Sequence, residues 1–258
     1  MTESDTYAAY AEGRDNPRFT DWLRERSQPD WDAAVDHRFV EELGAGTLDE
    51  DVFATYLVQD YAFVAELVGT FGHAVGQAPD MASKRRLIEF LDTVTDEEND
   101  YFERSFTELG VEGSRWQDPE PTPATAGFID LLGRAAREGG YAETLAVLVP
   151  AEWIYESWAT AAVETHGDAD AEGPPSAGMG LPFYFSEWVD LHAVDAFVAF
   201  VDWLRRELDA VGPTLSPRRE ARIASLFDRT VACERQFFDA AYETTGASSE
   251  TADSEVSL

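Results

Sequence analysis

The sequence predicts an all-α protein folded as a multi-helix bundle, and three observations support this prediction. From Pro17 onward, apolar residues recur at three- and four-residue spacing, which is the pattern of amphipathic helices. The sequence contains neither a convincing run of strands nor an internal repeat. Its 258 residues, 44% of them hydrophobic, are enough to bury one sizeable core.

The periodicity predicts helices that are separated by breaks rich in Gly, Pro or polar residues. The predicted helices span residues 18–26, 31–43, 49–76, 81–108, 123–138, 141–164, 183–209 and 216–244. The segment Thr47-Leu48-Asp49-Glu50 has capping-box spacing ahead of a long periodic run, which predicts a helix start. The stretch 167–182 is rich in Gly, Pro, Asp and Ser and is expected to form a surface loop.

The pattern predicts a single helical domain over residues 17–245. Residues 1–16 are polar and are expected to form a loosely held extension. Residues 246–258 are mostly Ser, Thr and acidic residues, a composition that predicts a disordered tail.

The net charge is extreme, with 51 acidic against 19 basic residues and a formal charge of −32. Lys84 is the sole lysine, so almost all basic residues are arginines. Salt screens charges within roughly 3 Å at 1 M, so self-repulsion of such a chain costs little in concentrated salt. This favours a halophilic cytoplasm over the alternative, an acidic protein that recruits a basic partner. Nucleic acid is not expected as a partner, because the sequence offers no basic face for phosphates.

Neither a membrane span nor a signal peptide is expected, since the sequence has no run of about 18 apolar residues and no basic-then-apolar N-terminus. We therefore expect a cytoplasmic protein with no membrane partner. The single cysteine, Cys233, excludes an intramolecular disulfide and a thiolate zinc cluster.

The two most apolar predicted segments, 53–76 and 141–163, are expected at the centre of the bundle. A polar residue inside such a helix is informative, which singles out Asp60 and Glu152. His192 in the apolar 183–209 segment joins them.

Tyr56, Asp60 and Phe63 share one helix face at i, i+4 and i+7. A carboxylate flanked by aromatic rings suits an aminopyrimidine, because the rings stack while the carboxylate accepts from an exocyclic amine. The alternative is a buried aspartate that a helix end or a tyrosine satisfies, and spacing alone favours this alternative.

Glu234 shares a helix face with Phe237, Phe238 and Tyr242. A glutamate among aromatic rings is poorly solvated, which raises its pKa and makes it a proton donor near neutrality. The alternative is an ion pair with an arginine from another helix.

A third candidate segment follows Pro150 on a predicted helix. Proline inside a helix frees a carbonyl and bends the axis. Glu152 and Tyr155 are at i and i+3, and Ala151 and Tyr155 at i and i+4, so both pairs can border one cavity.

Metal and cofactor chemistry is not expected. None of the histidines, which are His37, His73, His166 and His192, follows a glutamate by three residues, so the Glu-x-x-His pairs of bundle di-iron sites are absent from the sequence. Gly-rich phosphate loops, HExxH and GxSxG motifs are absent too.

Taken together and in order, these segments resemble the TenA (thiaminase II) family, a branch of the haem-oxygenase-like α-helical fold. The resemblance runs from about Asp36 to Tyr242. Its strongest parts are Phe39 through Gly46-Thr47-Leu48, Phe53-x-x-Tyr56-x-x-Gln59-Asp60, Tyr141-Ala142-Glu143-x-Leu145-Ala146, Pro150-x-x-Trp153-x-Tyr155 and Glu234-x-x-Phe237-Phe238-x-x-Ala241-Tyr242.

The resemblance implies a haem-oxygenase-like bundle, a homotetramer, and a deep pocket that binds the aminopyrimidine half of thiamin. It implies that Asp60 holds the pyrimidine amine and ring nitrogen, that Glu234 is the acid/base, and that Tyr155 orders the surroundings of the nucleophile. The remaining substrate-binding residues implied in this way are Tyr56, Phe63, Phe128, His192 and Phe238.

The sequence also departs from the family pattern. Ala151 occupies the position of the nucleophilic cysteine, so the usual covalent mechanism cannot run there. Phe63, Phe128 and His192 stand where the family commonly has tyrosine. Cys233 is no substitute, because it lies one residue before Glu234 and therefore points about 100° away around the helix.

A cysteine-lacking branch of the family is associated with hydrolysis of aminopyrimidine or formylaminopyrimidine breakdown products of thiamin, and the resemblance implies this function here. Glu152, beside the vacant position, is the candidate to activate water or to attack directly. The alternative for Glu152 is that it faces solvent or pairs with an arginine. The alternatives for the whole protein are a non-catalytic thiamin- or pyrimidine-binding protein and a protein of this fold that acts on another small molecule.

Overall fold

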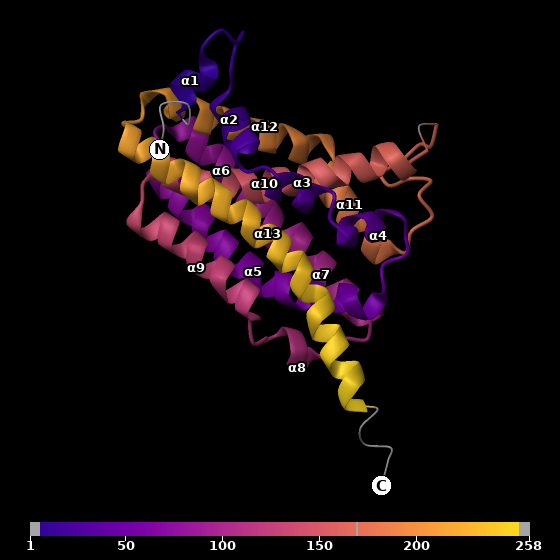
Figure 1. Cartoon of the computed structure of the whole chain (residues 1–258). Coiled ribbons are helices and arrows are strands. Elements are labelled where there is room, and N and C mark those ends of the chain that lie inside the picture. Colours follow the sequence, from indigo (N-terminus) through magenta and orange to yellow (C-terminus); the bar gives the residue numbers. More distant parts are fainter. Residues whose placement is uncertain (1–5, 169, 253–258) are drawn as a thin grey trace.

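The computed structural model describes residues 6–168 and 170–252, and within this part of the chain the ordered elements are all helical (Figure 1). The elements in chain order are α1 Tyr7–Ala11, α2 Phe19–Arg26, α3 Asp30–Val35, α4 Arg38–Gly44, α5 Glu50–Gln77, α6 Met81–Thr93, the π-helical segment η2 Val94–Glu98, α7 Asn99–Glu108, α8 Gly113–Trp116, α9 Pro123–Glu138, α10 Tyr141–His166, α11 Phe183–Ala193, α12 Asp195–Val211, the short 3₁₀ segment η3 Gly212–Thr214 and α13 Pro217–Ala252. The predicted fold class is confirmed.

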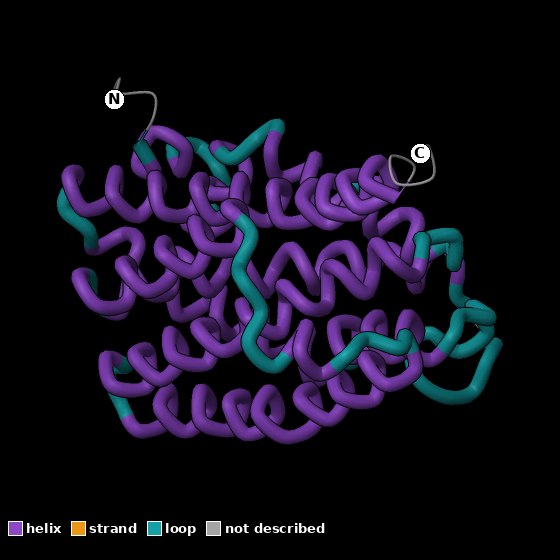
Figure 2. Tube along the Cα trace, turned by 90° about the horizontal axis from the view of Figure 1, so that it is seen from below, coloured by secondary structure: helices purple, strands orange, loops and turns teal. Residues whose placement is uncertain are grey.

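Helix α10 is the centre of the bundle. It packs against α13, α12, α11, α9, α5 and α4, and its residues 142–155 are all buried. Helix α5 also packs against α10, and it contacts α9, α6 and α13. In Figure 1 the long α13 crosses in front of α5 and α10. Figure 2 shows many helices running side by side, with loops at their ends and one loop that crosses the middle of the view. The two segments expected to be central are therefore central.

Helix α5 begins where its side-chain cap is made. Asp49, within the segment predicted to start a helix, accepts hydrogen bonds from the backbone N–H groups of Asp51 and Val52, so it is the N-cap. The helix then continues without a break to Gln77, one residue beyond the predicted end.

Three predicted helices are divided or distorted in the structure. The predicted 31–43 helix breaks at His37, whose Nδ1 accepts from the backbone N–H of Phe39 and so caps α4 instead of continuing α3. The predicted 183–209 helix breaks at Val194, whose backbone is extended. The predicted 81–108 helix contains the π-helical segment η2, and this distortion matters for the cavity described below.

The two ends of the chain also differ from expectation. Part of the predicted loose extension forms α1, because the Tyr7 ring packs on Phe19 and Trp22 at centroid distances of 5.2 and 6.0 Å, and its hydroxyl donates to the carbonyl of Pro17. At the other end, α13 continues beyond Gly246, where a disordered tail was predicted, as far as Ala252. Residues 1–5 and 253–258 lie outside the described residues.

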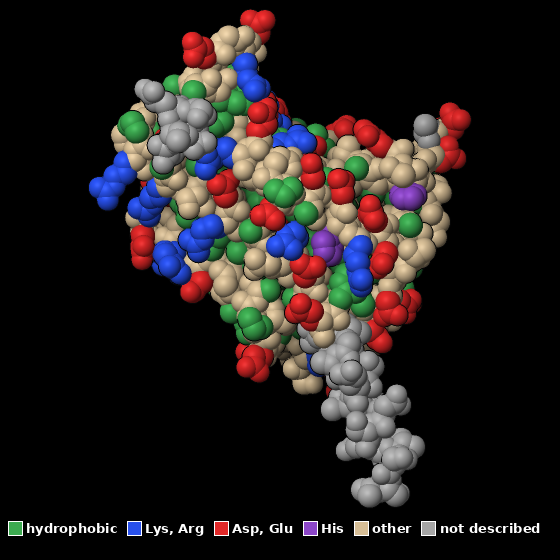
Figure 3. Space-filling view, in the orientation of Figure 1, with side chains coloured by type: hydrophobic (Ala, Val, Ile, Leu, Met, Phe, Trp, Pro, Cys, Tyr) green, Lys and Arg blue, Asp and Glu red, His purple; other side chains and the backbone are tan. Residues whose placement is uncertain are grey.

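The surface carries acidic side chains interspersed with arginines, as the face in Figure 3 shows. Within the described residues, the helices are all too short or too polar to cross a membrane.

Candidate active site

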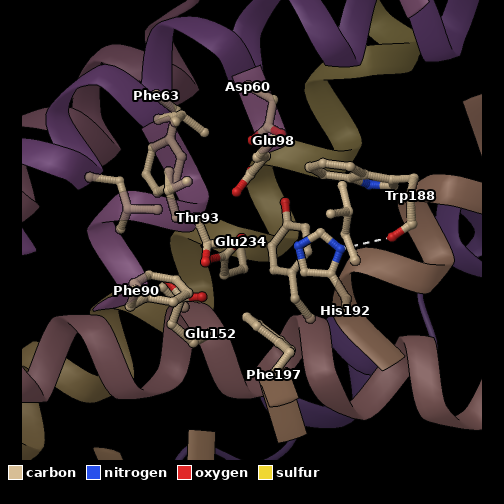
Figure 4. A pocket seen from close by; sticks show the side chains of 16 residues that line it. Asp60, Phe63, Phe90, Thr93, Glu98, Glu152, Trp188, His192, Phe197 and Glu234 are labelled. Atoms are coloured by element: carbon tan, nitrogen blue, oxygen red, sulfur yellow. Dashed lines mark hydrogen bonds between the residues drawn. The ribbon is translucent and has the colours of Figure 1, made fainter. Parts of the chain in front are cut away.

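A cavity of about 60 Å³, room for a few water molecules, lies inside the bundle (Figure 4). Side chains from α5, α6, η2, α10, α11, α12 and α13 enclose it. The lining residues are Asp60, Phe63, Val64, Leu67, Phe90, Thr93, Val94, Glu98, Ala151, Glu152, Tyr155, Trp188, Leu191, His192, Phe197 and Glu234. Elements distant in the sequence thus bring most of the predicted site residues together.

Asp60 projects from α5 into this cavity. Its side chain is 3% exposed, and its Oδ2 atom is buried without a hydrogen-bond partner. Burial, and next the charge of Glu98, raise the pKa of Asp60 well above its usual range, while hydrogen bonding from Tyr56 opposes the rise. A tyrosine is therefore near Asp60, as the alternative interpretation required, but one carboxyl oxygen stays free for a ligand.

Glu152 and Glu234 face the same space from α10 and α13. They are 6% and 1% exposed, and the Oε1 atom of Glu234 is buried without a partner. Burial raises the pKa of both carboxyls well above the usual range, and Asp60 contributes to both shifts. Neither glutamate forms an ion pair with an arginine among the described residues. The ion-pair and solvent-facing alternatives therefore do not describe them.

The position without a nucleophile also faces the cavity. Pro150 lies inside α10, where it has no N–H for the usual bond to the preceding turn, and the helix continues past it to His166. Ala151, Glu152 and Tyr155 follow it and all three line the cavity. Ala151 thus presents its methyl group to the cavity, next to the buried carboxyl of Glu152.

Hydroxyl and imidazole groups complete the polar part of the wall. The Tyr155 hydroxyl lies 2.7 Å from the Tyr56 hydroxyl. His192 Nδ1 lies 2.8 Å from the Trp188 carbonyl, and burial lowers the pKa of His192 to about 4. A neutral ring beside a carbonyl oxygen must carry its proton on Nδ1, so it donates there and leaves Nε2 as an acceptor.

Three predicted substrate-binding residues do not line the cavity and stand behind its wall instead. Tyr56 contacts the lining residues Tyr155, through its hydroxyl, and Asp60, without lining the cavity itself. The Phe128 ring packs on the far side of Phe63 at a centroid distance of 4.5 Å, and the Phe238 ring lies 6.0 Å from Tyr155. They are buried and hold the lining rings in position.

Glu98 lines the cavity and was not predicted from the sequence. It is half-buried at the end of η2, and burial raises its pKa to about 7. Figure 4 shows its side chain near Asp60, pointing into the space that Glu152 and Glu234 also face. The acidic residues beside it hide it in the sequence, and the signal that could have found it is its helical spacing from the apolar Val94 and Tyr101.

Four carboxyl groups therefore meet one cavity that has no Lys or Arg among its lining residues. Within the part of the chain that the structure describes, no three His, Cys, Asp or Glu side chains come close enough to hold a metal ion. The four groups are thus distributed around the cavity rather than gathered at one point, as suits an organic ligand with several polar atoms.

Comparison with known proteins shows which chains are similar to this one over most of its length. An aminopyrimidine aminohydrolase from Halalkalibacterium halodurans is 27% identical over 220 residues, which are 85% of this chain and 93% of that protein. Among solved structures, a TenA homologue from P. horikoshii superposes with a TM-score of 0.73 at 22% identity, covering 88% of this chain and 99% of that one.

The same architecture extends to haem oxygenases. Haem oxygenase-2 from Synechocystis superposes with a TM-score of 0.51 at 15% identity over 90% of this chain and 88% of that one, so the fold is haem-oxygenase-like. The model of the TENA/THI-4/PQQC family matches residues 24–244, which is most of the chain. The chain belongs to the TENA/THI-4/PQQC family.

Proposed function

We propose that this protein is a hydrolase of thiamin salvage that cleaves a C–N bond in aminopyrimidines derived from thiamin. The observation that carries the proposal is the buried cavity in which Asp60, Glu152 and Glu234 face aromatic rings without a basic partner. The relative named aminopyrimidine aminohydrolase, similar over most of both chains, supports the same reaction.

Asp60 is suited to anchor the pyrimidine. A neutral carboxyl group donates through its hydroxyl and accepts through its other oxygen, which matches a ring nitrogen beside an exocyclic amine. The raised pKa of Asp60 favours this protonated form, and its Oδ2 atom has no partner in the protein. Phe63 offers an aromatic face to the ring.

Glu152 and Glu234 are suited to the chemical step. In the reaction, an aminomethyl-substituted ring and water give a hydroxymethyl-substituted ring and ammonia. Glu234 donates a proton to the leaving amine, the C–N bond breaks with its electron pair on nitrogen, and water adds to the methylene carbon as Glu152 takes its proton. Burial raises the pKa of both carboxyls well above the usual range, which favours the protonated form that the acid needs before it donates.

Ala151 also allows a second function, that of a non-catalytic pyrimidine-binding protein. Without the thiol, a protein of this family could bind the pyrimidine and leave it intact, which is the role of a non-catalytic binding protein. The position of Glu152, directly next to Ala151 and inside the cavity, favours hydrolysis, because a carboxyl there can activate water in place of the thiol.

Ammonia release from an aminomethyl-aminopyrimidine, measured in high salt, tests the proposal. Glu152→Gln and Glu234→Gln are expected to lower turnover by about 100-fold or more, the usual size of an acid–base contribution. Calorimetric binding of the hydroxymethyl product is expected to persist in both. Glu164→Gln, at an exposed position of the same helix α10, is the matched control.

Each result has a distinct meaning. Full turnover in either cavity variant would refute its assigned role. Binding without turnover in the unsubstituted protein would replace the hydrolase with the binding protein. Formate released from a formylaminomethyl analogue, without ammonia from the amine, would redirect the proposal to amide hydrolysis.

We also propose that the protein works as a homotetramer in a salt-rich cytoplasm and that residues 17–245 form one domain. The composition, with a net charge of −32, supports the salt-rich setting. The contacts of α10 and α13 with most other helices support a single domain.

A further inference from the structure

Glu98 enters the cavity from the last position of the π-helical segment η2. It lies four residues after the buried Val94 and three before the buried Tyr101, so it stands on the inward-facing side of this stretch. Thr93 and Val94, at the start of the distortion, also line the cavity, while Asp96 and Glu97 stay exposed. One glutamate of an acidic stretch is thus turned inward, and π turns of this kind are frequent at functional sites.

This fourth carboxyl group is unfavourable for the protein without a ligand. Burying acids without basic partners costs free energy, and here the neighbours of Glu98 are themselves acids. The charge of Glu98 raises the pKa values of both Asp60 and Glu152, so its carboxylate is within electrostatic reach of both. Perturbed acids that share a cleft are typical of functional sites, and a cationic ligand would supply the positive charge that this cavity lacks.

The cavity is prepared for such a ligand. Oδ2 of Asp60 and Oε1 of Glu234 are both buried and without a partner, and both residues line the cavity. These two free acceptors are evidence for a polar ligand that does not depend on the count of acidic residues.

The position of Glu98 indicates which atom of the ligand it meets. In the substrate class proposed above, the exocyclic amine and the substituted methylene are attached to neighbouring ring carbons. If Asp60 holds the exocyclic amine and Glu152 directs water to the methylene, then Glu98, which is close to Asp60 and Glu152, lies beside the methylene substituent. That substituent is the amine that must leave.

We propose that Glu98 is a catalytic residue that binds the substituent nitrogen as an ammonium group, and that it thereby selects aminomethyl pyrimidines over those with a neutral substituent. The proposal rests on the proposed function. An ammonium substituent leaves readily as neutral ammonia. A neutral amine would have to leave as an amide ion, which is a poor leaving group. A carboxylate beside the nitrogen favours its protonated form, whose proton Glu234 supplies, and the C–N bond then breaks with its electron pair on nitrogen.

The test compares two ligands of nearly equal shape, an aminomethyl- and a hydroxymethyl-aminopyrimidine, by calorimetry in multimolar potassium chloride. Glu98→Gln is expected to weaken binding of the amine at least about tenfold, the size of a lost charge-assisted hydrogen bond, and to change binding of the alcohol by less than about twofold. Glu98→Asp, which keeps the charge, is expected to retain part of the preference. Glu97→Gln, exposed in the same turn, is the control.

The outcomes separate this inference from the proposed function. If the unsubstituted protein releases ammonia but Glu98→Gln keeps its preference for the amine, only the role of Glu98 is overturned. Equal weakening of both ligands in Glu98→Gln and Glu98→Asp would show a structural role and also overturn it. If the unsubstituted protein binds neither pyrimidine, both proposals fall.

Discussion

Replacing Glu98 with glutamine is expected to stabilise the unliganded protein, by an amount that depends on pH. The substitution keeps the shape of the side chain and removes its ability to ionise. Glu98 is half-buried, faces other acids and has no Lys or Arg beside it in the cavity, so its charge costs free energy in the folded state.

The magnitude follows from the pKa. Burial raises the pKa of Glu98 from 4.5 to about 7, which corresponds to about 3 kcal/mol at about 1.4 kcal/mol for each pKa unit. Between these two values the folded state holds a proton that the unfolded state has lost, so stability falls as pH rises through this window. Below pH 4.5 the carboxyl is neutral in both states and nothing is lost. Above about pH 7 the full cost applies.

The assay is urea unfolding in constant high salt at pH 4.5 and pH 8, the two sides of the window set by the Glu98 pKa. Glu98→Gln is expected to be more stable than the unsubstituted protein by about 3 kcal/mol at the higher pH and by less than about 0.5 kcal/mol at the lower one. Glu97→Gln, exposed in the same turn, should differ little at either pH. A gain of equal size at both pH values would refute the reasoning, because it would not come from ionisation.

Two further outcomes follow from other parts of the molecule. Arg219→Leu is expected to destabilise the protein by about 2 kcal/mol in urea unfolding, because the buried Glu143, which pairs with Arg219 at 2.7 Å, loses its cation. The control is Arg134→Leu, which breaks an exposed pair with Asp130 and should cost less than about 0.5 kcal/mol. Equal effects of the two substitutions would contradict the argument. Lowering the salt from multimolar to millimolar is expected to dissociate or unfold the protein, because a net charge of −32 is then poorly screened. Unchanged sedimentation and ellipticity over that range would count against it.

The sequence predicts the central helices well because their patterns are long and strongly apolar. Helix α10 begins at the predicted Tyr141 and ends two residues beyond the predicted 164, and α5 starts and stops within one residue of 49–76. The three carboxyl groups that the sequence predicts, Asp60, Glu152 and Glu234, all line the cavity. Asp60 and Glu152 belong to apolar helices, and Glu234 shares a helix face with aromatic residues, so all three face inward.

The remaining features depend on tertiary structure. The bend at Val194 carries neither Gly nor Pro, so local sequence does not signal it. Phe238 shares a helix face with Glu234, and Phe128 lies on α9, which contributes no lining residue; the rings of Tyr155 and Phe63 stand next to them at the cavity wall. Which ring of a packed pair touches a ligand is decided by helix placement and not by spacing along one helix.

Glu98 shows why an inward-facing acid can escape sequence analysis in a chain this acidic. Asp60 was identifiable because its helix is apolar, whereas Glu98 belongs to a polar stretch in which every acid is expected to face water. What distinguishes Glu98 from its acidic neighbours is its helical spacing from the buried Val94 and Tyr101. The same residue links stability to function, because a carboxylate that lowers the stability of the empty protein can recover that free energy by pairing with a cationic substrate. Glu98→Gln is therefore expected to have two effects with one physical cause: a more stable unliganded protein and a lower affinity for the amine. Observing either effect without the other would separate the charge of Glu98 from its proposed role.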